Sequence, residues 1–92
     1  MREKTIEQEL KDQIELINGK CLKWVSPGTS GVPDRIVLYK GNIWFVELKS
    51  PTGYLSPLQE YWGRWLTKNK FNYRVISSKE QVKQFINDIQ SI

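Results

Sequence analysis

The sequence contains no histidine and only one cysteine, Cys21, among its 92 residues. Without histidine, the chain cannot form a Ser-His-Asp or Cys-His catalytic group, a zinc hydrolase site with histidine ligands, or a hydrolytic site with a histidine base. One cysteine supports neither an internal disulfide nor a cysteine-based zinc site. Any hydrolytic chemistry must therefore come from carboxylates, lysine, tyrosine or a metal ion that prefers oxygen ligands.

Long apolar segments are also missing. No apolar run approaches the roughly 20 residues that a helix needs to cross a bilayer, and residues 1–4 (Met-Arg-Glu-Lys) are not followed by the apolar stretch of a signal peptide. We therefore expect an intracellular protein without a membrane partner. The short length predicts a single domain over residues 1–92, and a domain this small buries only about 60–65% of its unfolded surface.

The charge balance is basic, with 14 Lys and Arg against 10 Asp and Glu, a net charge of +4 and a pI near 9.3. Such a balance favours a polyanionic partner such as nucleic acid, although many small proteins are basic for solubility alone. Four Trp, four Tyr and three Phe are enough for a compact core and argue against disorder. In so small a chain, they also suggest an apolar face that a second copy covers.

Hydrophobic spacing and turn residues predict three helices and four strands. Thr5 is the expected N-cap of the first helix, and Asn18-Gly19 is its expected end. Lys40-Gly41-Asn42 is expected to join two strands as a hairpin. The predicted elements are a helix to residue 17, strands at 21–25, 34–39 and 43–48, a helix at 57–68 capped by Ser56, a strand at 73–76, and a helix capped by Ser77 or Ser78. This α-β-β-β-α-β-α order predicts an α/β fold with one mixed sheet flanked by helices.

The end of the second hairpin strand carries two charged residues at alternate positions, Glu47 and Lys49. Side chains at i and i+2 of a strand share one side, so these two should stand together while Leu48 faces the core. We expect this charged side to be half-exposed. Asp34 opens the first hairpin strand, and a turn near Lys40 brings it close to Glu47.

Two adjacent carboxylates repel each other, so a positive charge is needed beside Asp34 and Glu47. Lys49 supplies one charge, and Mg²⁺ or Mn²⁺ would supply two, because these ions prefer carboxylate and water oxygens. Such an ion polarises a phosphate and activates water, and a nearby lysine orients the water or stabilises developing charge. The simpler interpretation is an exposed Glu-x-Lys ion pair and an aspartate that begins a turn.

Three segments together resemble a known family. Pro33-Asp34 with Glu47-x-Lys49 is similar to the PD-(D/E)xK nuclease signature, which implies a restriction-endonuclease-like core. Gly31-Val32-Pro33-Asp34, Glu47-Leu48-Lys49 and Leu55-Ser56-Pro57-Leu58-Gln59 more narrowly resemble a VRR-NUC domain. The similarity extends from Glu7 to Val75, and the combination of segments is more specific than each part.

The resemblance implies a role for each matching residue. Asp34 and Glu47 would be metal ligands together with the main-chain carbonyl of Leu48, Lys49 would be the catalytic lysine, and Gln59 would reach the site from the second helix. The family also places a glutamate in its first helix, and the residue expected there is Glu7, with Glu3 and Glu9 as alternatives. Gln59 has a second expected role, because it completes a capping box with Ser56.

The resemblance further implies the reaction and the partners. Standalone members are expected to be homodimers that act as Mg²⁺- or Mn²⁺-dependent endonucleases on branched DNA such as Holliday junctions. A nuclease for flaps, nicks or plain duplex, a non-catalytic DNA-binding module and a protein-interaction domain are the alternatives. Five cations are candidates for phosphate contacts, although scattered surface charges are the simpler interpretation: Lys23, Arg35, Arg64, Lys68 and Lys70.

Overall fold

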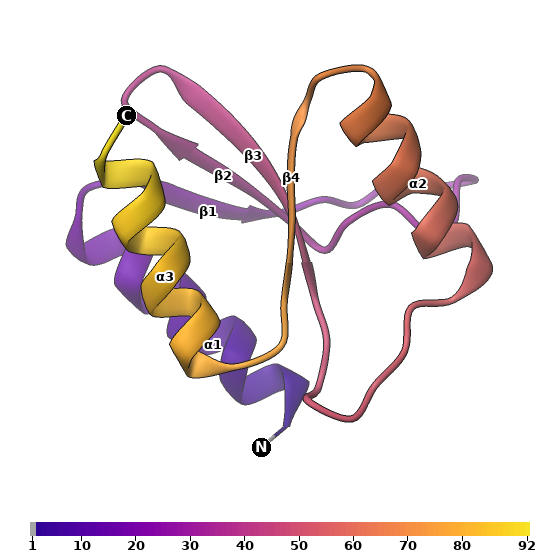
Figure 1. Ribbon diagram of the computed structural model, residues 1–92, viewed down its shortest axis with the longest axis horizontal. Helices are drawn as coiled ribbons and strands as arrows, with labels where there is room; N and C mark the ends of the chain where they lie inside the picture. Colours follow the sequence, from indigo (N-terminus) through magenta and orange to yellow (C-terminus); the bar gives the residue numbers. More distant parts are fainter. Residues whose placement is uncertain (1) are drawn as a thin grey trace.

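A computed structural model describes residues 2–92 (Figure 1). Its elements follow the predicted order and confirm the α/β class. They are α1 (Glu3–Leu16), β1 (Lys20–Lys23), β2 (Arg35–Tyr39), β3 (Asn42–Leu48), α2 (Pro57–Lys68), β4 (Asn72–Ile76) and α3 (Lys79–Gln90). None of the helices described is long and apolar enough to cross a membrane.

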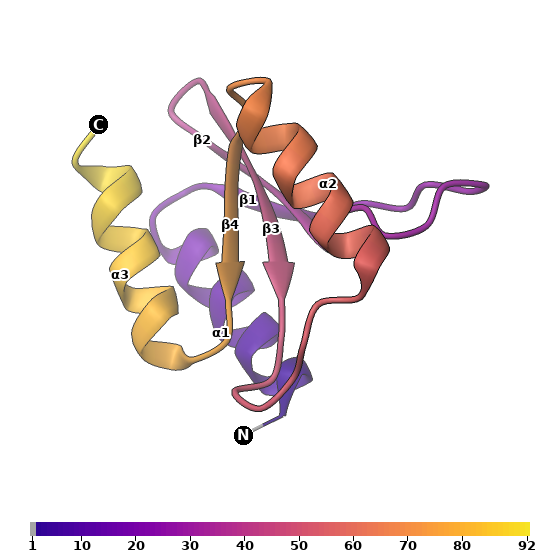
Figure 2. The same cartoon turned by 45° about the vertical axis from the view of Figure 1, so that its right-hand side comes forward.

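The four strands form one mixed sheet in the order β1-β2-β3-β4. The first three strands are antiparallel neighbours, whereas β3 and β4 run parallel, as their arrows show in Figure 2. A tight two-residue turn joins β2 to β3, because Tyr39 pairs with Asn42 and both Lys40 and Gly41 have positive φ. Two consecutive positive φ values match the twist of a hairpin. This turn fixes the register of the two strands.

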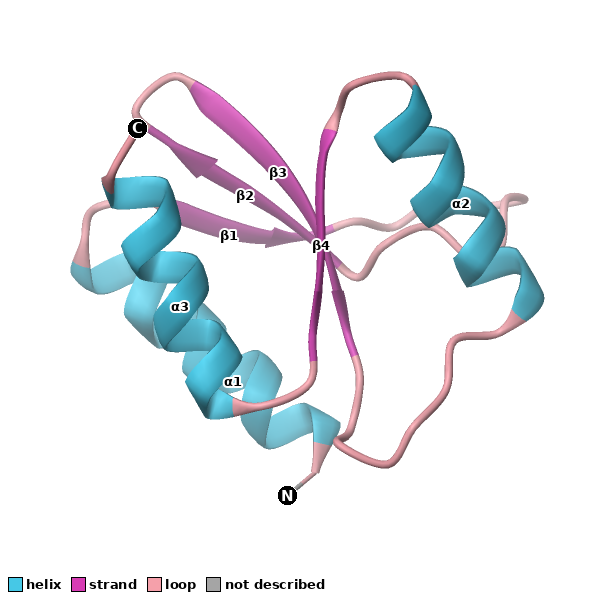
Figure 3. Ribbon diagram, in the orientation of Figure 1, coloured by secondary structure: helices cyan, strands magenta, loops and turns pink. Residues whose placement is uncertain are grey.

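The two faces of the sheet are covered unequally. Helices α1 and α3 pack side by side on one face, and α2 alone lies on the other (Figure 3). The main core is on the two-helix face, where the strands contribute alternate residues such as Val37, Val46 and Leu48. Helix α2 buries only Gly63 and Leu66. The α2 face therefore has only a small apolar core, and charged and aromatic side chains occupy much of it.

Most element ends lie within one residue of the predictions, and the larger differences are at the start of α1 and the end of β1. Helix α1 begins at Glu3 and not after Thr5; its N-cap is Arg2, whose carbonyl accepts hydrogen bonds from the amides of Thr5 and Ile6. Glu3 lies in the first turn, where the helix dipole favours an acidic side chain. Strand β1 ends at Lys23 rather than residue 25. Helix α2, in contrast, has the predicted Ser56 cap and complete capping box.

Candidate active site

Asp34 and Glu47 meet where β2 begins and β3 ends. Arg35 pairs with Val46 in the hairpin register, so Asp34 and Glu47 occupy the next positions outward. The Leu48 amide donates a hydrogen bond to Asp34 Oδ2 at 2.9 Å, and the carboxyl groups of Asp34 and Glu47 are themselves hydrogen-bonded. The structure thus brings the two predicted carboxylates together.

Glu47 is buried, with only 1% of its surface exposed. The prediction of a half-exposed charged side is wrong for this residue, because α2 crosses that face of the sheet. The amide of Gln59, in the first turn of α2, donates from Nε2 to Glu47 Oε2 at 3.2 Å. Gln59 Oε1 also accepts from the Ser56 amide at 2.8 Å. Both predicted placements of Gln59 hold, since one side chain completes the capping box and reaches Glu47.

The burial of Glu47 dominates the electrostatics of the site. Desolvation, the hydrogen bond to Asp34 and the negative charge of Asp34 together raise the pKa of Glu47 to about 9, against a smaller lowering by Lys49. Glu47 is therefore protonated at neutral pH. Lys49 is half-buried and close enough to influence both Glu47 and Glu3.

Glu3, in the first turn of α1, is close enough to Asp34 and Lys49 for their charges to change its pKa. Burial and then the charge of Asp34 raise the pKa of Glu3, while Lys49 lowers it. The start of α1 lies beside the end of β3 in Figure 2. Glu7 instead accepts a hydrogen bond from Arg35 Nε at 2.6 Å, on the other face of the sheet. The structure therefore does not support the placement of Glu7 in the acidic set.

The predicted phosphate-binding cations are not equivalent. Arg35 is 8% exposed and also donates to the carbonyl of Cys21, so it holds α1 to the sheet and does not form part of a DNA-facing rim. The prediction for Arg35 is corrected on this ground. The other four cations are exposed at the end of β1, on α2 and in the turn after α2: Lys23, Arg64, Lys68 and Lys70.

The donor atoms of this site suit a hard divalent cation. Within residues 2–92, no three Asp, Glu, Cys or His side chains are grouped so that they could hold a metal ion. The side-chain ligands available at this site are therefore the two carboxyl groups of Asp34 and Glu47. Mg²⁺ is commonly bound by one or two carboxylates, with water and substrate phosphate in the remaining positions. Asp34 and Glu47 fit this requirement.

The loop before Asp34 is fixed to α2. Gly31 has φ +89°, and a Cβ atom there would lie 2.7 Å from Leu58 Cβ. Trp62 Nε1 donates to the Ser30 carbonyl at 3.2 Å. The loop and the start of α2 therefore form one packed unit, with Asp34 on one side and Gln59 on the other.

One residue near the site was not anticipated from the sequence. Tyr73 of β4 pairs with Phe45, two positions before Glu47, and its side chain lies under α2 against Gly63. The alternation of residues 73–76 indicated a strand only. The parallel pairing of β4 with β3, which places Tyr73 near the carboxylates, has no local sequence signal.

Comparison with known proteins defines the class. No family model matches the chain. A solved structure described as a "VRR_NUC domain" superimposes with a TM-score of 0.85 and 32% identity, covering 92% of this chain and 94% of that one. The chain is thus a nuclease domain, with the predicted α/β fold. It belongs to the VRR-NUC family, as the resemblance predicted.

A phage relative agrees with this assignment. "Putative nuclease p44" of Acyrthosiphon pisum secondary endosymbiont phage 1 is 47% identical over 60 residues. The match spans 64% of this chain and 64% of the phage protein, which is less than two thirds of its length.

Replacing Glu7 with Gln should destabilise the fold, because the largely buried Arg35 guanidinium loses its negative partner. Glu7 is 22% exposed at its side chain, so we expect a loss of about 2 kcal/mol in the free energy of unfolding, measured by urea denaturation in EDTA. Glu15→Gln, in an exposed pair with Lys11 at 3.7 Å, is the control and should cost less than about 0.5 kcal/mol. Equal losses of stability in both variants would refute a stabilising role for the Glu7–Arg35 ion pair.

The stability of the metal-free protein should fall as pH rises. The pKa of Glu47 is about 9 in the folded state, whereas its ordinary value is 4.5. Between these two pH values the folded state therefore binds more protons than the unfolded state, which stabilises the fold. This contribution is complete below pH 4.5 and is lost as pH rises through about 9.

Glu47→Gln removes that titration and should flatten the profile of melting temperature against pH in EDTA. The wild type should lose several degrees relative to the variant, since about 1 kcal/mol corresponds to about 4–8 °C in a domain of this size. Glu80→Gln, on the exposed first turn of α3, should leave the slope unchanged. Parallel profiles for wild type and Glu47→Gln would contradict the assignment.

Proposed function

We propose that this nuclease domain is a Mg²⁺- or Mn²⁺-dependent endonuclease that hydrolyses phosphodiester bonds in DNA. The observation that carries the proposal is the Asp34–Glu47 pair, in which Glu47 is buried and Asp34 half-buried, held between the Leu48 amide and Gln59 and placed near Lys49. Burying Glu47 beside a second acidic group is unfavourable in a fold without a use for the pair. A divalent cation gives both carboxylates a role.

Asp34, Glu47 and the main-chain carbonyl of Leu48 are the proposed metal ligands. The bound ion would polarise the scissile phosphate and lower the pKa of a coordinated water. Glu47 must give up its proton to bind, and the positive charge of Lys49 favours that release. Gln59 keeps Glu47 in position through Nε2 while the capping box fixes its own side chain.

Lys49 is the proposed catalytic lysine. Its ammonium group shares the side of the strand that carries Glu47, so it can orient the attacking water or stabilise the charge that develops on the phosphate. Glu3 is the proposed first-helix acid, because its carboxyl group interacts with both Asp34 and Lys49. In this role Glu3 replaces Glu7.

A homodimer is proposed on the α2 side of the sheet. Six aromatic residues form a continuous chain of ring contacts there, with centroid separations of 5.1–6.1 Å. We call these residues the aromatic belt: Trp24, Phe45, Phe71, Trp65, Trp62 and Tyr61. Trp65 is 41% exposed and Phe71 48% exposed, with Leu22 and Ile43 similarly exposed. A second copy would bury these groups in a two-fold interface.

Branched DNA is the proposed substrate class. A two-fold dimer presents two carboxylate sites, as a four-way junction that is cut on two strands requires. The exposed cations at Lys23, Arg64, Lys68 and Lys70 are proposed phosphate contacts. Phosphate contacts position the protein without reading base sequence, which suits a nuclease that selects by DNA structure.

Lys49→Ala should lower the cleavage rate by at least about 100-fold, the scale of losing an electrostatic group at a reacting phosphate. The assay compares a four-way junction, a splayed duplex and a plain duplex, each with Mg²⁺ and with EDTA. Lys83→Ala, exposed on α3, is the control. Unchanged cleavage by Lys49→Ala would refute the site, and faster cutting of plain duplex would refute the junction preference. DNA binding without any metal-dependent cleavage would favour a non-catalytic module.

Trp65→Lys should disrupt the proposed dimer, because it places a charge in the aromatic belt. Sedimentation equilibrium should give the wild type about twice the 10.8 kDa chain mass, and the dimer Kd should rise at least about tenfold in the variant. Leu16→Lys, at a residue 74% exposed at the end of α1, should leave the mass unchanged. A monomeric wild type at micromolar concentration would rule the dimer out.

A further inference from the structure

The hydroxyl group of Tyr73 is buried without a partner. Within residues 2–92, it is the one buried side-chain nitrogen or oxygen atom that makes no hydrogen bond. A buried hydroxyl without a partner costs stability, and replacing it with hydrogen at the same site removes that cost. Phenylalanine would fill the same space, so the hydroxyl requires an explanation outside the packing of this fold.

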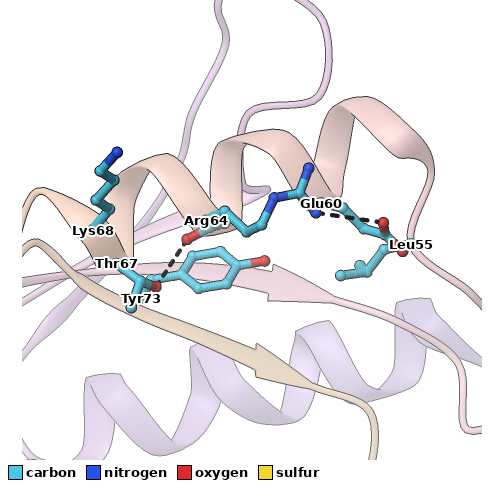
Figure 4. A pocket seen from close by; sticks show the side chains of 7 residues that line it. Leu55, Glu60, Arg64, Thr67, Lys68 and Tyr73 are labelled. Carbon is cyan, nitrogen blue, oxygen red and sulfur yellow. Dashed lines mark hydrogen bonds and ion pairs between the residues drawn. The ribbon is translucent and has the colours of Figure 1, made fainter.

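The position of Tyr73 is specified by its surroundings. A Cβ atom at Gly63 would lie 2.8 Å from Cε2, Cζ and the hydroxyl oxygen of Tyr73, so the lack of a side chain at Gly63 makes room for the end of the ring. Figure 4 shows the ring lying beneath α2, where it lines a cavity of about 490 Å³ along the helix. The hydroxyl oxygen itself is covered. The group is therefore held inside the protein and not presented to the cavity.

The carboxylate pair is the charged neighbour of this hydroxyl. Burial, followed by the negative charges of Glu47 and Asp34, raises the pKa of Tyr73 to about 12. Tyr73 is thus a hydrogen-bond donor at every pH at which the protein would work. Gln59, which donates to Glu47, lies one helical turn before Gly63, so α2 places both groups over the same part of the sheet.

Tyr73 pairs with Phe45, two positions before Glu47, so the side chains of Tyr73 and Glu47 lie on the same face of the sheet. Glu47 accepts a hydrogen bond from Gln59 through Oε2. As a metal ligand it would carry a full negative charge in a buried site, and carboxylates that bind metals are generally held by further hydrogen bonds. Tyr73 offers the unused donor of this region.

We infer that Tyr73 is a positioning residue whose hydroxyl group donates a hydrogen bond to the carboxyl group of Glu47 when Glu47 binds the metal ion. The inference rests on the proposed function, because it requires metal binding at Asp34 and Glu47. It explains why a tyrosine occupies this position although its hydroxyl group makes no hydrogen bond within residues 2–92. It also makes the hydroxyl a contributor to metal affinity and not to folding.

Tyr73→Phe tests the inference through metal binding rather than activity. Titration calorimetry with Mn²⁺ should give the variant a Kd about tenfold weaker than the wild type, the lower end of the effect of removing a hydrogen bond to a metal ligand. The melting temperature in EDTA should stay equal or rise, since a buried hydroxyl without a partner is removed. Tyr54→Phe, at a residue 91% exposed, is the matched control and should change neither quantity.

The outcomes separate this inference from the proposed function. If the wild type binds Mn²⁺ and Tyr73→Phe binds it equally well, the positioning role is wrong while the metal site stands. A variant that loses stability in EDTA but keeps its Mn²⁺ Kd would show a purely structural hydroxyl, which also overturns the inference. If the wild type shows no Mn²⁺ binding, both proposals fail.

Discussion

The hydrogen bond from the Leu48 amide to Asp34 is the contact on which the site depends. It connects the start of β2 to the end of β3 through a side chain, in the place where the regular strand pairing stops. The same contact turns the Asp34 carboxyl group toward Glu47. The β2–β3 register that makes this hydrogen bond possible is set at the opposite end of the hairpin by Lys40 and Gly41. A two-residue turn therefore positions carboxyl groups that lie several residues away.

Unequal coverage of the sheet gives the two faces different tasks. The α1–α3 face contains the apolar core and the Glu7–Arg35 clamp, which together support the sheet. On the α2 face, one short helix covers an acidic pair, a lysine and several aromatic rings. Because α2 buries little apolar surface of its own, its N-terminal capping box and its contact with the Gly31 loop contribute to holding it in place. Stability and chemistry are thus largely on opposite sides of one sheet.

Much of this arrangement was predictable from local sequence. The element order, the hairpin, the Ser56 cap and the proximity of Asp34 to Glu47 follow from turn residues and from the two-residue period of strands. The burial of Glu47 was not predictable, because it depends on α2 crossing over the strand after a loop with no strong directional signal. The partner of Glu7 was not predictable either, because its hydrogen bond with Arg35 depends on how α1 packs against β2. The position of Tyr73 near the site was not predictable, because it depends on the parallel pairing of β4 with β3, which leaves no local signal in the sequence.

The close approach of Gly31 to Leu58 constrains how this loop can diversify. Any side chain at Gly31 would push the first turn of α2 away from the sheet and carry Gln59 with it, whereas a Cβ atom at Gly28 would meet no heavy atom within 4 Å. Gly31 is therefore restricted both by its positive φ and by Leu58, whereas Gly28 is restricted by its positive φ of +81° alone. A longer loop around Gly28 would extend into open space, so it would leave Gln59 and the two carboxyl groups in place.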